Sequence, residues 1–167
     1  MVVRVMGIDP GFRCSGWGVI RWAGHNVHYE AGGLVVPNAQ ETIEHRLAHL
    51  YDNFHQLVAS HRPDIVSLEE TFVREDHPKS ALSLGQARGV IMAAVGAHGL
   101  NVVSYAPNVI KKALTGYGHS DKQGMMKMIK MILPQVPSGA KSDLYDALAV
   151  ALCHGHQGHS GQTVGGD

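Results

Sequence analysis

The N-terminus pairs a segment typical of a buried strand with a charge that a protein interior does not tolerate alone. Residues 2–8 are largely apolar, Asp9 follows directly, and Pro10 and Gly11 then break the chain. A carboxylate beside a buried strand raises the free energy of the folded state unless a partner compensates for it. Any fold available to this chain must therefore end the strand at an open edge, where Asp9 either starts a turn or binds a ligand.

The rest of the sequence predicts a mixed sheet flanked by helices. Three strand-like segments come first, separated by short turns that favour antiparallel hairpins, and helical and strand-like segments then alternate. The expected strands are residues 2–9, 16–22, 26–36, 64–70 and 101–106. The expected helices are residues 38–62, with Asn38 as N-cap, 80–98, 108–114, 121–132 and 142–154. This order predicts an α/β fold with a five-stranded sheet, whose ligands bind at the carboxyl ends of the strands.

The segment 80–98 differs from an ordinary surface helix because its residues are apolar or small on nearly every side. A helix of this kind must be covered on more than one side. The sheet supplies one cover, and a second surface, such as another subunit, is needed for the other. Gly85 and Gly89 would permit a close approach.

Length and composition limit the class of protein. A chain of 167 residues with 44% hydrophobic residues fits one domain and is too short for a two-lobed enzyme. No apolar run reaches the roughly 18–20 residues of a membrane span, and no segment resembles a secretory signal. We therefore expect a soluble, cytoplasmic protein that makes no membrane contact. Its two cysteines, Cys14 and Cys153, lack metal-ligand spacing and are expected to be free thiols.

The last residues predict a flexible end. Residues 155–167 are rich in Gly and His and lack apolar periodicity, so we expect them to be disordered. A single domain would then comprise residues 1–154. Three histidines, His154, His156 and His159, are interpreted as part of this flexible end rather than as a metal site.

Charge is distributed unevenly although the formal net charge is zero. Between His77 and Lys141 there are eight lysine and arginine residues and one acid, Asp121. Ten acids and six bases precede this stretch, and three acids follow it. A basic half joined to carboxylate-bearing ends suits a phosphate-binding surface around a metal site. Solvated helix faces are the alternative interpretation of the lysines.

Four carboxylates occupy positions where a site could form. Asp9 and Glu69 end the first and fourth predicted strands, so they meet at one edge if these strands are parallel neighbours. Asp143 and Asp146 lie three residues apart, so they share a face in the first turn of the last predicted helix. Taken singly, each acid can be a turn, strand-end or solvated charge. Converging carboxylates would raise one another's pKa, and a pair of divalent cations about 4 Å apart would relieve this and support phosphodiester hydrolysis.

Five segments are similar to one known family. They are GIDPGFRCSGWGVI, SLEETF, SALSLGQARGV, YAPNVIKKALTGYGHSDK and SDLYDALAVALCH, spread from Gly7 to about His154. In this order and spacing they resemble the bacterial RuvC-type Holliday-junction resolvases, crossover-junction endonucleases with a ribonuclease H-like fold. The resemblance implies a homodimer that binds a four-way DNA junction and nicks two opposed strands symmetrically. It also implies Mg²⁺ or Mn²⁺ as cofactor and branch-migration machinery as a partner.

The same resemblance implies the site residues. The family's catalytic and metal-binding acids fall on Asp9, Glu69, Asp143 and Asp146, which would hold two Mg²⁺ or Mn²⁺ ions per active site. Glu70 is the less favoured ligand, because the family's acid directly follows the last apolar residue of its strand.

The expected DNA contacts are Phe72, Arg74, Lys111 and Lys122. Phe72 matches a position near the cut, where its ring could stack on an unpaired base, and core packing is the alternative. Lys111 and Lys122 match basic positions near the scissile phosphate, and solvated lysines are the alternative. His119 and Ser120 match no family role. The small residues at 15–18 either leave room for a DNA backbone or form a tight hairpin.

We predict a metal-dependent, structure-selective DNA endonuclease that resolves Holliday junctions in recombination and repair by paired nicks. A related ribonuclease H-like nuclease acting on structured RNA is the nearest alternative. An actin-like or sugar-kinase-like ATPase, with residues 9–11 as its phosphate loop, would need a second lobe that this chain lacks. A non-catalytic junction-binding module is disfavoured, because clustered acids repel phosphate.

Overall fold

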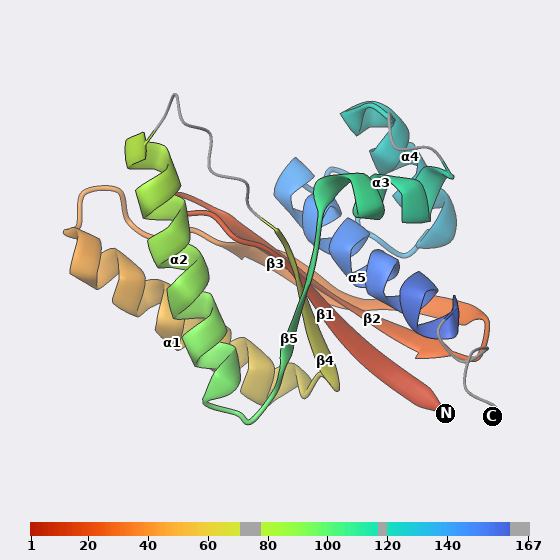
Figure 1. Ribbon diagram of the computed structural model, residues 1–167, viewed down its shortest axis with the longest axis horizontal. Coiled ribbons are helices and arrows are strands. Elements are labelled where there is room, and N and C mark those ends of the chain that lie inside the picture. Colours follow the sequence, from red (N-terminus) through yellow and green to blue (C-terminus); the bar gives the residue numbers. More distant parts are fainter. Residues whose placement is uncertain (71–77, 117–119, 161–167) are drawn as a thin grey trace, which may run out of the picture.

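The computed structural model describes residues 1–70, 78–116 and 120–160, which form a five-stranded sheet with helices on both faces (Figure 1). The strands are β1 (Val2–Asp9), β2 (Ser15–Ala23), β3 (Asn26–Val35), β4 (Ile65–Glu69) and β5 (Val102–Tyr105). Their order in the sheet is β3-β2-β1-β4-β5. The pairs β1–β2 and β2–β3 are antiparallel, whereas β1–β4 and β4–β5 are parallel. The predicted mixed five-stranded sheet is confirmed.

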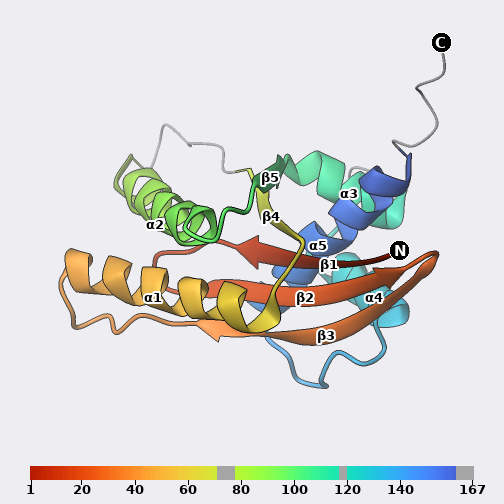
Figure 2. The same ribbon diagram turned by 90° about the horizontal axis from the view of Figure 1, so that it is seen from below.

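The helices divide into two groups, one on each face of the sheet (Figures 1 and 2). The first group consists of α1 (Ile43–His61) and α2 (Pro78–Gly96), and the second of α3 (Pro107–Thr115), α4 (Lys122–Ile132) and α5 (Ser142–Ser160). On the second face α5 lies directly on β1 and β2, and α3 and α4 pack against α5. Within the described residues, no helix is both long enough and apolar enough to cross a bilayer.

Alternation along β1 sends successive side chains to the two cores. Val5 belongs to the core beneath α5, whereas Met6 and Ile8 belong to the core beneath α1 and α2. Because side chains alternate along a strand, Gly7 and Asp9 share the face of Val5. The carboxylate that ends β1 therefore lies on the side of the sheet where α5 packs.

Glycines in β1 and β2 allow the backbone of α5 to touch the sheet. A Cβ on Gly7 would collide with the carbonyl oxygen of Ala147, and one on Gly16 would collide with that of Asp143. A Cβ on Gly18 would come within 2.6 Å of the Leu148 side chain. Gly16 and Gly18 therefore make room for α5, which is neither of the roles considered from the sequence.

The first helix begins later than its sequence predicts. Asn38 does not cap it, because the Asn38 side chain accepts a hydrogen bond from the Gln40 N–H at 3.0 Å and so forms a local turn. The helix starts at Ile43 with Thr42 as N-cap. It ends at His61, close to the predicted end, and Arg62 follows as the C-cap with left-handed backbone geometry (φ 46°).

The last helix continues six residues beyond its predicted end, to Ser160, so the expectation of disorder for residues 155–160 was wrong. The reason is packing against Trp22 on β2. Gly155 is buried against the Trp22 ring, and the ring of His156 meets the same ring edge-on, with 5.5 Å between the two ring centres. His154 is hydrogen-bonded to the Tyr105 hydroxyl at 2.6 Å. His154 and His156 are thus packing residues, while the His159 side chain and residues 161–167 lie outside the described part of the chain.

We expect Gly16→Ala to destabilise the protein by about 1–3 kcal/mol, because the added methyl group forces α5 off the sheet. Urea unfolding followed by circular dichroism measures this change. The matched control is Gly96→Ala, since nothing lies within 4 Å of a Cβ at Gly96. Equal unfolding free energies for the two variants would contradict the assigned role of Gly16.

Candidate active site

Asp9 and Glu69 lie side by side at one edge of the sheet. In the parallel pair of β1 and β4, Ile8 is opposite Leu68, so the next residue of each strand is an acid. This confirms that the two predicted strand-end carboxylates share one edge. Glu70 is placed differently, because its backbone N–H donates to the carbonyl oxygen of Tyr105.

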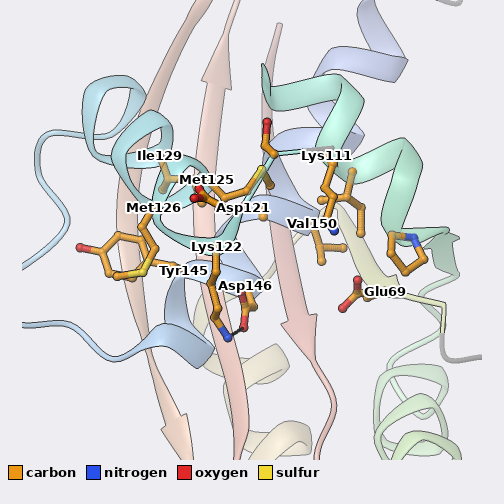
Figure 3. A pocket seen from close by; sticks show the side chains of 14 residues that line it. Glu69, Lys111, Asp121, Lys122, Met125, Met126, Ile129, Tyr145, Asp146 and Val150 are labelled. Atoms are coloured by element: carbon orange, nitrogen blue, oxygen red, sulfur yellow. Dashed lines mark hydrogen bonds and ion pairs between the residues drawn. The ribbon is translucent and has the colours of Figure 1, made fainter. Parts of the chain in front are cut away.

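Asp143 and Asp146, the acids of α5, lie at the same edge because α5 packs closely on Gly16. In the β1–β2 ladder Gly16 is opposite Asp9, and the backbone of Asp143 packs on Gly16. Asp146 lies one turn further along α5 and faces the same pocket as Glu69 (Figure 3). The structure therefore brings all four predicted acids to one region.

The two strand-end carboxylates, Asp9 and Glu69, have raised pKa values. Burial raises the pKa of Asp9 to about 7, and the negative charges of Asp146, Glu69 and Asp143 contribute further. Burial is also the main cause that raises the pKa of Glu69, followed by the charge of Asp146, while Lys111 and Lys122 act in the opposite direction. The positive charges of these lysines offset burial and repulsion only in part, so the pKa values of Asp9 and Glu69 stay raised.

Lys122, at the start of α4, is bound to one of the acids. Its ammonium nitrogen lies 3.0 Å from Oδ2 of Asp146 (Figure 3). This hydrogen bond, together with the charge of Asp146, raises the pKa of Lys122. A lysine predicted to contact phosphate thus pairs with one of the candidate catalytic acids.

A pocket of about 260 Å³ opens beside these residues, between α3, α4 and α5. Glu69, Lys111, Lys122 and Asp146 line its polar part, and apolar side chains such as Met125 and Ile129 line the remainder (Figure 3). Ser120 also lines this pocket, which gives it a place in the site that the sequence did not reveal. Phe72, Arg74 and His119 lie outside the described residues.

The donor atoms of the site suit a hard divalent cation. All four acids offer carboxylate oxygens, which Mg²⁺ and Mn²⁺ prefer over nitrogen or sulfur ligands. Within the described residues, no three of the His, Cys, Asp and Glu side chains already stand close enough together to hold a metal ion. A cation would therefore have to draw the carboxylates together.

Arg88 holds the end of β4 in place, a role that the sequence did not indicate. One guanidinium nitrogen donates to the carbonyl oxygen of Glu69 at 2.5 Å, and the other donates to the Ser104 hydroxyl at 2.6 Å. Arg88 was counted in the basic stretch expected to bind phosphate. In the structure its guanidinium instead forms hydrogen bonds that link α2 to β4 and β5 behind Glu69.

The loop that follows Asp9 is fixed from two directions. The Ser15 hydroxyl accepts a hydrogen bond from the Gly11 N–H at 3.0 Å and donates to the Gly11 carbonyl at 2.8 Å. Arg46 of α1 donates to the carbonyl oxygen of Phe12 at 3.0 Å, and its guanidinium lies 3.9 Å from the centre of the Phe12 ring. These contacts hold the exit of β1, and with it Asp9, in one geometry.

Comparison with known proteins extends this description. Residues 5–154 match the family described as "Crossover junction endodeoxyribonuclease RuvC". The protein of that name from Rhizobium johnstonii is 42% identical over 154 residues, which cover 92% of this chain and 90% of the relative. The structure titled "T. thermophilus RuvC in complex with Holliday junction substrate" superimposes with a TM-score of 0.89 and 31% identity, covering 95% of this chain and 96% of that one.

The pKa of Asp9 leads to a stability prediction. In the folded state it is about 7, above its ordinary value of 3.8, so ionisation of Asp9 increasingly destabilises the fold as the pH rises from about 4 to 7. In metal-free buffer at pH 8, Asp9→Asn should raise the free energy of unfolding by roughly 2 kcal/mol, a gain that disappears near pH 4. Urea unfolding across this pH range measures the gain.

Asp52→Asn, which removes an exposed carboxylate from α1, serves as the control for this measurement. A stability difference between Asp9→Asn and the wild type that does not change with pH would contradict the electrostatic explanation. Addition of Mg²⁺ should stabilise the wild type more than Asp9→Asn.

Proposed function

The chain belongs to the RuvC family of crossover junction endodeoxyribonucleases, and we propose from this membership how its active site works. It is a DNA endonuclease that resolves Holliday junctions, and its fold is the ribonuclease H-like α/β fold predicted from the sequence. We assign catalysis to Asp9, Glu69, Asp143 and Asp146. The observation that carries this assignment is the convergence of Asp9 with three further acids at one sheet edge, where burial and their charges raise its pKa.

The four acids are proposed to hold two Mg²⁺ or Mn²⁺ ions per active site. Bound divalent cations would supply an activated water and charge stabilisation at the leaving oxygen of the phosphodiester. Asp9 is the central ligand in this proposal, because the negative charges of all three other acids reach it. The rigid backbone contact of α5 with Gly16 orients Asp143, and Arg88 orients the strand end that carries Glu69.

The lysines of the pocket are proposed to neutralise the phosphate. Lys111 and Lys122 both line the pocket that contains Glu69 and Asp146. Lys122 would leave Asp146 when DNA and cations bind and would then pair with a phosphate oxygen. The ion pair seen in the structure thus keeps the acid partly neutralised until the substrate arrives.

We propose a homodimer that forms through the outer face of α2. The inner face is buried in the core by Ala87, Ile91, Ala94 and Val95. The outer face exposes Leu82 and Met92, with Gly85 and Gly89 between them open to close approach. α2 packs beside α1 on one face of the sheet and lies at the outside of the molecule (Figure 1). A two-fold dimer of this kind presents two active sites, as symmetric nicking of two strands requires.

The remaining partners follow from family membership. We propose that the protein acts on four-way junction DNA alongside branch-migration machinery. Because its substrate is cellular DNA, we propose that it works in the bacterial cytoplasm. Phe72 and Arg74 are kept as proposed DNA contacts.

Asp9→Asn should lower the rate of nicking of a synthetic four-way DNA junction by more than about 10²-fold, because a carboxylate ligand of the cations is lost. Junction affinity in EDTA should stay within about threefold of the wild type, because the basic residues are unchanged. The assay compares a mobile junction, an immobile junction, duplex DNA and structured RNA, with and without Mg²⁺ or Mn²⁺. Asp52→Asn is the control. Full nicking activity in Asp9→Asn would overturn the assignment.

Lys122→Gln should have two separable effects. Nicking at saturating Mg²⁺ should slow by about 10- to 100-fold, because a phosphate contact is lost. The Mg²⁺ concentration for half-maximal activity should fall, because no ammonium group competes for Asp146. Titration of nicking rate against Mg²⁺ measures both effects, with Lys127→Gln on the same helix as control. An unchanged or increased Mg²⁺ requirement in Lys122→Gln would exclude this competition.

A further inference from the structure

The active-site pocket has an apolar part that plays no role in the proposed catalysis. Its walls come from α3, α4 and α5, and we term it the apolar recess, formed by Ile110, Met125, Met126, Ile129, Ala149 and Val150. The whole pocket encloses about 260 Å³. The methionines of α4 lie on one side of it and Glu69 on the other, with Lys122 and Asp146 between them (Figure 3). The apolar recess is therefore continuous with the space beside the catalytic acids.

The apolar recess has a rigid floor and an adjustable edge. Its residues from α3 and α5, together with Ile129, are buried members of the core beneath α5. Met125 and Met126 are only partly buried and pack against this core. Methionine side chains are unbranched and flexible, so they adapt to the shape of a bound group. The recess is thus a preformed apolar surface that a ligand can cover.

The pocket as a whole suits a ligand with a flat apolar body and an anionic end. Lys111 and Lys122 line its polar part, and the apolar recess forms the remainder. A nucleotide of a DNA strand combines both properties, because its phosphate is charged and the faces of its base are apolar. Enzymes that extrude a base from the stack hold it between aromatic or apolar side chains. A second hollow, beside Asp143, differs because its lining includes the basic Arg13 and Lys79.

The acids determine which nucleotide reaches the apolar recess. Glu69 and Asp146 line the same pocket, and Oδ2 of Asp146 lies 3.0 Å from the ammonium nitrogen of Lys122. A phosphate held among these groups leaves the base of its own nucleotide next to the apolar walls. We propose that the apolar recess binds one unpaired base of the cut strand, from a nucleotide that adjoins the scissile phosphate. This inference rests on the proposed active site, because the acids mark where the strand is cut.

Base binding in the apolar recess would contribute to selection of the DNA structure. A base enters the recess only after it leaves its partner and its stack, and this step is least costly where the base is already unpaired or mispaired. Intact duplex opposes the step, whereas the branch point of a four-way junction offers bases whose pairing is interrupted. The recess therefore favours nicking at a branch point over nicking within a duplex.

The first test follows the base by fluorescence. 2-Aminopurine replaces, one at a time, the bases that flank the cut in a four-way junction, and the protein is added in EDTA so that no nicking occurs. Wild-type protein should change the emission of one flanking position by at least about twofold, because the base exchanges its stacked neighbours for apolar side chains. Positions distant from the cut should not respond. Absence of a response at every flanking position would overturn the proposal.

Two variants alter the apolar recess in opposite ways. Ala149→Leu fills it from the floor, and Met125→Ala removes part of its edge, so both should abolish most of the fluorescence change. The matched control is Met131→Ala on the same helix, because Met131 is 78% exposed and does not line the pocket. Thermal unfolding verifies that each variant is folded, and Met125→Ala alone decides the test if Ala149→Leu does not fold. A fluorescence change equal to that of the wild type in the folded variants would overturn the proposal.

The second test separates a contact with the base from a contact with the phosphate. Met125→Ala should slow nicking of the normal junction by about 5- to 20-fold, whereas on a junction that is abasic at the responding position it should match the wild type within about twofold. Lys122→Gln should slow nicking of both junctions alike, because the abasic nucleotide keeps its phosphate. Equal slowing of both junctions by Met125→Ala would show that the base does not enter the recess.

These experiments distinguish failure of the recess from failure of the active-site assignment. If the wild type nicks the junction and Asp9→Asn does not, while 2-aminopurine responds equally to wild type and recess variants, only the recess inference is wrong. If Asp9→Asn retains full activity, the active-site assignment is wrong, and the recess inference, which depends on it, is overturned as well.

Discussion

The contact between the α5 backbone and the glycines of β1 and β2 determines where the active site lies. Without side chains at Gly7 and Gly16, the helix approaches until its own carbonyl groups touch the sheet. This approach places Asp143 next to the strand position opposite Asp9. A displacement of about 1 Å is enough to impair catalysis by orders of magnitude. Glycine at these positions is therefore as much a part of the site as the acids are.

The acids themselves oppose the fold that brings them together. Burial and mutual repulsion raise the pKa of Asp9 to about 7, which makes its ionised form unfavourable in the folded state. Lys122 relieves part of this repulsion by pairing with Asp146 at 3.0 Å. Positive charge brought to this site would therefore lower the free energy of its ionised acids. The same property that destabilises the free protein thus favours the divalent cations that we propose for this site.

The basic residues divide between structural and proposed binding roles according to their surroundings. Arg88 is bound to the backbone of Glu69 and to Ser104, and Arg46 is bound to Phe12, so both position the site from within. The planar guanidinium suits this task, because it donates several hydrogen bonds in a fixed geometry. The exposed Arg13 and Lys79 and the partly exposed Lys111 differ, since their side chains line the hollows beside the acids. Net charge of zero conceals this arrangement entirely.

The sequence by itself determined the elements and the identity of the acids, whereas only the tertiary structure decided their partners. Local periodicity reports which residues are buried, so the strand ends at Asp9 and Glu69 and the helical pair Asp143 and Asp146 were predictable. The resemblance of five segments to one family then assigned their chemistry. Pairing of Lys122 with Asp146 or Arg88 with Glu69 was not predictable, because these residues lie 24 and 19 positions apart. Continuation of α5 to Ser160 depended in the same way on Trp22, a distant side chain whose ring needed a cover.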